Sequence, residues 1–280
     1  MTHEEAADLM DTRLDGSHRD GHGSPQTLPR AASGTSLAPL KSLKDTECGR
    51  LAAMIEELEL PTTRRRFVPG DVVYQGREPE DGLYILTEGI LSVSDLLPGG
   101  KSFTTRMLTV SDTFGRLNPT DPEETLTVPS TDAAFYAGYV EASATALTDS
   151  EILKVPKALL RRALRLSPEA ALSLATLTEL RLAEQERLVR VLSSRRTESR
   201  LAGLLPLLAE KFSRGDGGDG GEGAVIMLRL THQDLSDMIS TTRESVTKAI
   251  SDLQARQAIG YSRGLIVLLD PEKLRYAATG

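Results

Sequence analysis

Five polar side chains near the C-terminus are spaced so that they could read the edges of DNA bases. They fall on one face of a predicted helix: Thr242, Arg243, Glu244, Thr247 and Lys248. An arginine can donate to guanine O6 and N7 together, a glutamate accepts from cytosine N4, and a lysine reaches guanine or phosphate. We therefore predict that these residues form a DNA-binding surface.

The helices that would hold these side chains are predicted from caps and apolar spacing. Thr231 and Thr241 are each followed three residues later by an acid, which is typical of a helix start. Apolar residues recur at helical spacing in both segments: Leu235, Met238 and Ile239 in the first, and Val246, Ile250 and Leu253 in the second. Two short helices joined by a tight turn predict a helix-turn-helix, whose second helix lies in the DNA major groove. The alternative is an ordinary αα-hairpin whose charges are merely solvated.

The segments on both sides favour a winged helix-turn-helix. Residues 224–230 are rich in β-branched and apolar side chains and predict a strand. Residues 258–269 predict two short strands around Ser262-Arg263-Gly264, a hairpin with glycine in its turn. Strand, helix, helix and hairpin follow one another in the order that a winged helix requires.

Composition limits the classes of protein that this chain can be. It has 280 residues and a formal net charge of −7, which favours two domains and argues against a nonspecific polycation. Residues 228–280 hold seven Lys or Arg against six Asp or Glu, so phosphate binding must depend on where a few cations lie. No apolar run reaches the length of a membrane helix and no signal region is present, so we expect no membrane partner. The single cysteine, Cys48, excludes internal disulfides and favours the cytoplasm.

The first half of the chain predicts a tail followed by a small β-domain. Residues 1–44 are rich in Ser, Gly, Pro and Asp and are expected to be disordered. Their three histidines are expected to be solvated rather than to bind metal: His3, His18 and His22. A short helix at about 45–60 comes next, and the strands that follow are typical of a β-sandwich or barrel. Those strands are expected at residues 64–68, 72–75, 83–87, 90–94, 102–108, 135–142 and 144–155. A short helix at 156–164 closes the domain.

Residues 166–196 predict one long helix. Ser167-Pro168-Glu169 supplies the cap, the proline and the acid of a helix start, and the helix is expected to run to about Ser194. Residues at alternating three- and four-residue spacing would form a coiled-coil seam between two copies: Leu174, Leu177, Arg181, Glu184, Leu188 and Val191. The alternative is a helix packed on its own domain, although its length favours the seam. Another helix is expected at 197–212, followed by a flexible Gly-rich loop at 215–223.

This order of elements resembles the cyclic-AMP receptor/fumarate-nitrate regulator (CRP/FNR) family of bacterial transcription factors over residues 45–280. The most specific segment is STTRESVTK, residues 240–248, which resembles the start of the family's recognition helix. The resemblance implies an α+β fold: a cyclic-nucleotide-binding-like β-roll, or jelly roll (45–165), a dimerisation helix (166–196) and a winged helix-turn-helix (197–280). It also implies a homodimeric activator in the bacterial cytoplasm, with palindromic double-stranded DNA and RNA polymerase as partners.

The family senses several effectors, and three of them are disfavoured by the residues present. A cyclic nucleotide requires a glycine–glutamate pair and a later arginine–serine pair, whereas this chain has Gly115-Arg116 and Tyr136-Ala137. An iron–sulfur cluster needs several cysteines, and one is present. Haem needs an axial ligand, and no histidine lies in the β-roll or the long helix.

A fourth effector, 2-oxoglutarate, is implied by a closer resemblance. Residues 167–201 and 114–117 resemble the cyanobacterial nitrogen-control branch (NtcA) of the family, which binds this acid. Arg181 would bind a carboxylate of the ligand, and the backbone of 114–117 would donate amides. The implied effector site is therefore Phe114, Gly115, Arg116, Leu117, Arg181 and Glu186.

Two departures from that branch leave alternatives open. Ala134 replaces an arginine expected before Phe135-Tyr136, and the acidic residues 118–132 would repel a dianion. Arg181 and Glu184 could instead form a salt bridge that sets the seam register. The alternative function is therefore an effector-independent dimeric DNA-binding protein that acts through RNA polymerase. An enzyme is not expected, because His232 is the only histidine outside the tail and cannot by itself build a cupin-like metal site.

Overall fold

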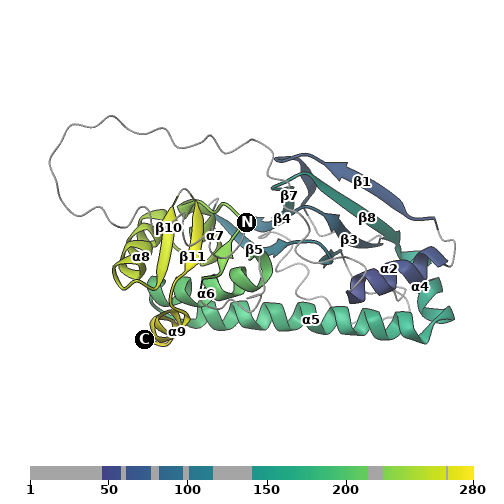
Figure 1. The fold of residues 1–280 in the computed structure, drawn as a ribbon. Coiled ribbons are helices and arrows are strands. Elements are labelled where there is room, and N and C mark those ends of the chain that lie inside the picture. Colours follow the sequence, from purple (N-terminus) through teal and green to yellow (C-terminus); the bar gives the residue numbers. More distant parts are fainter. Residues whose placement is uncertain are drawn as a thin grey trace, which may run out of the picture.

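A long helix joins a strand-rich part of the chain to a helical part in the computed structural model (Figure 1). The structure describes residues 46–57, 61–76, 82–96, 101–115, 141–213, 223–262 and 264–280. The expected tail with its histidines, the acidic stretch 118–132 and most of the Gly-rich loop therefore lie outside the described residues.

Helix α5 (Pro168–Ser193) begins where the sequence predicts, because its first turn is capped as expected. The Ser167 hydroxyl accepts a hydrogen bond from the Ala170 backbone N–H at 3.1 Å, and Pro168 occupies the first turn. Near its start, α5 packs on helices α2 (Glu47–Glu57) and α4 (Lys157–Leu166). Towards its end, it packs on α6 (Thr197–Phe212), so it spans both parts of the chain.

Two four-stranded antiparallel sheets form the β-roll. The first has the order β1-β8-β3-β6, with bounds Thr63–Phe67, Ser150–Pro156, Gly82–Glu88 and Thr113–Phe114. The second has the order β2-β7-β4-β5, with bounds Val72–Gly76, Glu141–Ala146, Leu91–Leu96 and Ser102–Leu108. The expected sandwich of short strands is thus confirmed for the described residues.

Alternation along strand β3 shows how the first sheet separates two apolar cores. Leu83 and Ile85 pack with α2, α4 and α5, whereas Leu86 packs with the strands of the second sheet. Side chains of a strand point to opposite faces in turn, so one strand serves both cores. Phe114 is fully buried in the inter-sheet core and stacks on Tyr84 and Tyr74, with ring centroids 5.0 and 5.8 Å away.

The single strand predicted at 144–155 is wrong, because the chain turns at 147–149 and divides it into β7 and β8. The turn is fixed from outside: Leu147 N–H donates to the Ile90 carbonyl, and the Thr148 hydroxyl accepts from Ile90 N–H, both at 2.9 Å. The polar run Thr148-Asp149-Ser150 is a turn signal that the apolar residues around it concealed. Of the strand predicted at 135–142, only the last two residues are described, and they belong to β7.

The C-terminal part is a winged helix-turn-helix, as predicted. After α6 come β9 (Val225–Ile226), α7 (His232–Met238), α8 (Arg243–Ala255), β10 (Ile259–Ser262), β11 (Leu265–Leu268) and α9 (Pro271–Thr279). Strands β10, β11 and β9 form an antiparallel sheet in that order. The strand predicted at 224–230 is shorter than expected, since only β9 pairs with β11. Helix α9 was not predicted, although Asp270 caps it and Pro271 stands in its first turn.

The two parts of the chain contact each other directly as well as through α5. Helix α7 lies against strand β5, and Ile90 and Met107 of the β-roll belong to the apolar core of the C-terminal domain. Met238 of α7 is buried in the same core. None of the described helices is long and apolar enough to cross a membrane.

Gly89 should be far less tolerant of substitution than Gly70, although both have positive φ angles, +89° and +93°. A Cβ on Gly89 would lie 2.2 Å from Ser150 Oγ and 2.3 Å from the Asp149 carbonyl, whereas a Cβ on Gly70 meets nothing within 4 Å. Gly70→Ala should cost about 1–2 kcal/mol through backbone strain alone. Gly89→Ala should add about 1–3 kcal/mol from overpacking. Urea unfolding of both variants measures the difference, and equal losses would contradict the steric argument.

Candidate nucleic-acid interface and effector pocket

Helix α8 presents all five predicted DNA-reading side chains to solvent. Its inner face is buried and holds Val246, Ala249, Ile250 and Leu253. Its outer face is exposed and holds Thr242, Arg243, Glu244, Thr247 and Lys248. The structure therefore brings the predicted residues together on one accessible surface of the second helix of the motif.

The cap of α8 is Thr242 and not Thr241, which corrects the sequence prediction. The Thr242 hydroxyl accepts from Ser245 N–H at 3.3 Å, while Thr241 N–H donates to the Ser236 carbonyl at 3.0 Å. Ser240 has a φ of +52°, so the backbone adopts a left-handed conformation at this residue and the helix begins one residue later than predicted. Arg243 becomes the first helical residue, and Glu244 is not positioned to close a capping box. The capping box predicted for Thr231 and Asp234 is confirmed.

His232 supports the exposed face, a role that the sequence did not reveal. Its Nδ1 lies 2.8 Å from the Thr247 hydroxyl, and that hydroxyl donates to the Arg243 carbonyl at 2.9 Å. The His232 ring is 5.1 Å from the ring of Tyr261 in the wing, and the Tyr261 hydroxyl donates to the Leu230 carbonyl at 3.1 Å. Thr247 thus links the two helices of the motif while lying on its outer surface.

Arg200 connects the motif to the end of the long helix. Its Nε donates to the Ser194 carbonyl at 2.7 Å and its Nη1 to the Ile239 carbonyl at 3.1 Å. Ser194 is the C-cap of α5 and Ile239 is the C-cap of α7. A single guanidinium therefore ties the turn before α8 to the place where α5 stops.

Arg181 meets the predicted effector turn. Its Nη1 donates to the Gly115 carbonyl at 3.2 Å. Arg181 also lines a pocket of about 320 Å³ together with Thr113 and Leu177. Phe114 lies directly before Gly115 but is buried in the β-roll core. Arg116 and Leu117 lie outside the described residues. Glu186 does not line the pocket; it is exposed on α5, 3.5 Å from Arg190.

Arg106 lines the same pocket and was missed by the sequence analysis. It lies on β5, is 9% exposed, and donates from Nη2 to the Thr113 carbonyl at 2.8 Å. An arginine that is nearly buried is unusual and needs polar partners in the fold. The signal available in the sequence was one charge within the otherwise uncharged strand SFTTRML.

Lys211 of α6, which is mostly buried, forms ion pairs with α5 and with the turn at 111–115 beside this pocket. Lys211 of α6 places its Nζ 2.8 Å from Asp112 Oδ2 and 2.6 Å from Glu184 Oε1 of α5. Burial by itself would lower the pKa of Lys211, but the two carboxylates more than offset this and raise the pKa above its ordinary value. Glu184 therefore forms an ion pair with Lys211 of the same chain. The sequence had suggested a salt bridge between Glu184 and Arg181 instead.

The face of α5 predicted as a dimer seam packs inside the chain, which corrects that assignment. Leu174 and Leu177 are buried against the β-roll, and Leu188 and Val191 pack against the C-terminal core. A different set of apolar side chains is exposed, with exposures of 68% for Leu172, 59% for Leu180, 57% for Leu182 and 65% for Val189.

A metal-binding site is not evident among the described residues. They contain no cluster of three or more His, Cys, Asp or Glu side chains that could hold a metal ion. Burial, followed by the charge of Asp112, raises the pKa of the Cys48 thiol to about 12. A thiol with that pKa stays protonated at neutral pH and is a poor metal ligand.

Two family models match the parts of the chain in the order seen in the structure. Residues 64–128 match the cyclic nucleotide-binding domain, and residues 199–277 match the Crp-like helix-turn-helix domain. The first match covers strands of the β-roll, and the second covers most of the C-terminal winged helix.

Known proteins similar over most of their length are transcriptional regulators. A global nitrogen regulator of Synechococcus elongatus is 26% identical over 227 residues, which cover 80% of this chain and 95% of that protein. A CRP-like cAMP-activated global transcriptional regulator of Mycobacterium tuberculosis is 26% identical over 85% of this chain and 96% of its own. The solved structure of a CRP/FNR-family transcriptional regulator from Thermus thermophilus has a TM-score of 0.55 at 26% identity, covering 78% of this chain and 99% of that one.

Proposed function

The chain belongs to the CRP/FNR family of transcriptional regulators, and from this premise we propose that it is a homodimeric regulator that reads a palindromic DNA site under the control of a small acid. The observation that supports sequence-specific reading most directly is the exposed row of side chains on α8. Arg243 and Glu244 stand in its first turn, the part of a recognition helix that contacts base edges.

Dimerisation is supported by the exposed apolar stripe of α5. Residues 172, 175, 179, 182, 186 and 189 alternate by three and four positions, which is the spacing of a coiled-coil seam. Leu172, Leu182 and Val189 on this stripe are each more than half exposed. The other positions of the stripe are Ala175, Glu179 and Glu186. Large apolar side chains exposed at this spacing are typical of a surface that a partner covers. Glu186 lies on the stripe, so its contact with the effector would depend on the dimer.

The effector that we propose is 2-oxoglutarate, bound between the turn at 111–115 and α5. Arg181 and Arg106 donate to backbone carbonyls on this turn, Gly115 at 3.2 Å and Thr113 at 2.8 Å. A carboxylate is a stronger acceptor than a neutral carbonyl, so a ligand acid could take over these guanidinium donors. Cyclic AMP is less well suited, because Arg116 replaces the glutamate of the family's nucleotide-binding pair.

RNA polymerase is the protein partner that we propose for an activator of this family. The edge strand β1 offers a basic surface far from α8, with three consecutive arginines, Arg64 to Arg66. Glu151 pairs with Arg64 and Arg66, and the Arg66 side chain remains 84% exposed. Such a surface suits an acidic patch on a partner protein. An effector-independent regulator that works through this contact is the alternative function.

Arg243→Ala should lower affinity for the best palindromic site by about 1–3 kcal/mol and relax the preference at one base pair. Affinity for random DNA should fall much less. Arg275→Ala on α9, an exposed arginine paired with Glu272, is the matched control and should change neither. Fluorescence anisotropy at fixed salt gives both affinities, and an equal fall on specific and random DNA would contradict base reading by Arg243.

Leu182→Glu should convert the dimer to a monomer, because it places a charge on the α5 stripe. Leu180→Glu is the control: its side chain is equally exposed, at 59% against 57%, but it lies off the stripe. Light scattering after size-exclusion chromatography reports the mass of each variant. A dimer that survives Leu182→Glu but not Leu180→Glu would show that the stripe is assigned to the wrong register.

Addition of 2-oxoglutarate should tighten DNA binding by about 5-fold or more, the lower end of common allosteric couplings. Arg181→Ala should abolish this response, because it removes the guanidinium that would bind the acid. Anisotropy titrations with no ligand, with 2-oxoglutarate and with cyclic AMP make the comparison. Equal affinity in all three would favour the effector-independent regulator.

A further inference from the structure

We infer that Lys211 is a latch that couples the effector pocket to the position of the DNA-binding domain. This inference rests on the proposed function only for the identity of the signal. The latch itself is the contact of Lys211 Nζ with Asp112 at 2.8 Å and with Glu184 at 2.6 Å. One cation thereby joins the β-roll, the long helix and the first helix of the DNA-binding domain.

The position of the latch makes it sensitive to the geometry of its partners. The Lys211 side chain is 17% exposed, Asp112 is 24% exposed and Glu184 is 39% exposed, so the pair with Asp112 is the better shielded of the two. Ion pairs that are shielded from water are screened little by salt, and removal of one partner leaves an uncompensated charge behind. A small displacement of Lys211 relative to its two carboxylate partners therefore changes the stability of the docked arrangement more than the loss of a surface pair would.

Asp112 stands on a turn that is rigidly built. The Asp112 carboxylate accepts from Thr109 N–H at 2.7 Å, and the Asp112 carbonyl accepts from Leu86 N–H at 3.0 Å. Ser111 holds a φ of +77°, which is uncommon outside glycine, and its hydroxyl accepts from Thr46 at 3.0 Å. Strained residues fixed in this way are often part of a switch.

The same turn reaches the effector arginine at its other end. Gly115 follows Asp112 by three residues and accepts from Arg181, while Asp112 pairs with Lys211. Arg181 and Glu184 are three residues apart on α5 and so share one face of the helix. A ligand acid that takes Arg181 away from Gly115 would remove a contact between α5 and the rigid turn, and so shift Glu184 of α5 relative to Asp112.

Lys211 can pass such a shift to the recognition helix because α6 is packed as one body with the motif. Leu208 and Phe212, on either side of Lys211, are buried in a core that contains Val246 and Ile250 of α8. Helix α6 therefore cannot move without carrying α8 with it. Packed interiors transmit displacement because they are dense and hold few voids.

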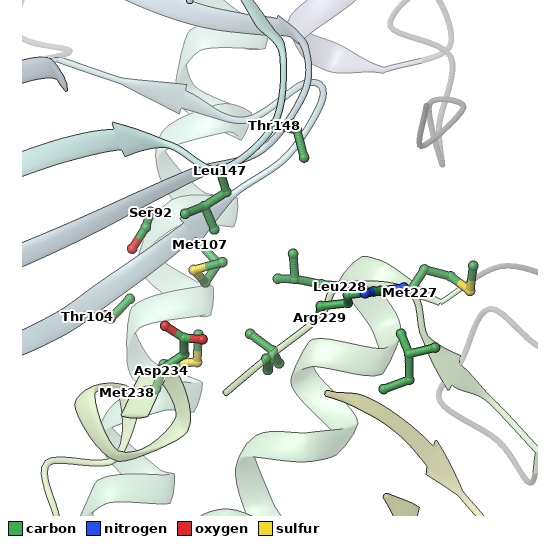
Figure 2. Close-up of a pocket in the computed structure, with 12 residues that line it drawn as sticks. Ser92, Thr104, Met107, Leu147, Thr148, Met227, Leu228, Arg229, Asp234 and Met238 are labelled. Carbon is green, nitrogen blue, oxygen red and sulfur yellow. The ribbon is translucent and has the colours of Figure 1, made fainter. Parts of the chain in front are cut away.

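Beside the buried Ile90 and Met107, part of the contact between the β-roll and the DNA-binding domain is loosely filled. A pocket of about 410 Å³ lies between them. Figure 2 shows Met107, Leu147 and Thr148 on one side of it and Leu228 and Arg229 on the other. Side chains that line a cavity lack the dispersion contacts that would otherwise help to hold two domains in one arrangement. The Lys211 pairs therefore add to the docking specificity that the apolar contacts of Ile90 and Met107 supply.

The test is the distribution of distances between spin labels on the two domains, measured without DNA or effector. Labels at Gln75→Cys and Arg275→Cys occupy exposed positions on β2 and α9, and the buried Cys48 thiol is protected from the label. Dilution with unlabelled protein removes distances between protomers. Lys211→Met and Asp112→Asn should each broaden the distribution at least twofold relative to the parent.

Arg187→Met is the matched control. Arg187 lines the same pocket and joins α5 to Glu210 of α6 at 2.6 Å, but Glu210 is its ion-pair partner among the described residues and the turn at 111–115 is not, so its loss should leave the distribution narrow. Asp112→Asn keeps the size of the side chain and removes only the charge, which guards against a folding defect in Lys211→Met. Unchanged distributions in both latch variants, or equal broadening in Arg187→Met, would overturn the inference.

Measurements of DNA affinity with and without 2-oxoglutarate distinguish two outcomes: that Lys211 is not a latch, or that 2-oxoglutarate is not the effector. If 2-oxoglutarate tightens DNA binding of the parent protein, the latch variants should reduce that gain to less than twofold. A full ligand response in Lys211→Met would overturn the latch while leaving the effector in place. If the parent does not respond to the acid, the effector assignment fails, and the distance measurement still decides the latch.

Discussion

The packing of one face of α5 inside its own chain is the constraint on which the rest of the structure depends. Leu174 and Leu177 secure the helix to the β-roll, while Leu188 and Val191 secure it to the DNA-binding domain. Since these contacts use up one face, the apolar residues left on the other face need a different partner. A single helix thus fixes the distance between the two domains and offers a surface for a second copy.

Charge plays a more localised role than apolar packing in this protein. The C-terminal region is almost neutral, so its affinity for DNA cannot come from bulk positive charge and must come from a few placed side chains. The contacts between the domains likewise depend on a few charged side chains. Lys211, Arg181 and Arg200 each connect segments that are distant in the sequence, and each does so at the boundary between two structural units.

The region proposed to bind the effector combines a rigid part and an adaptable one. The turn at 111–115 is held by backbone bonds to β3, and Phe114 anchors it in an aromatic stack. Facing it, Arg106 and Arg181 bind carbonyl oxygens that another acceptor could replace. A pocket of this design can exchange a protein acceptor for a ligand acceptor without rebuilding its walls. This exchange would link binding in the β-roll to the helix that carries the DNA-reading domain.

Local signals in the sequence determined most of the elements and the exposed face of α8 that we predict to read DNA. Caps such as Ser167 and Thr231, the apolar spacing of α8 and the segment 240–248 act over a few residues, so they can be read without the fold. Tertiary structure decided what those signals leave open. Two registers of α5 satisfy the same three- and four-residue alternation, and only packing shows which is inward. The left-handed Ser240 moved the cap to Thr242, and the pairing of Lys211 with Asp112 joins residues that only the folded chain brings together.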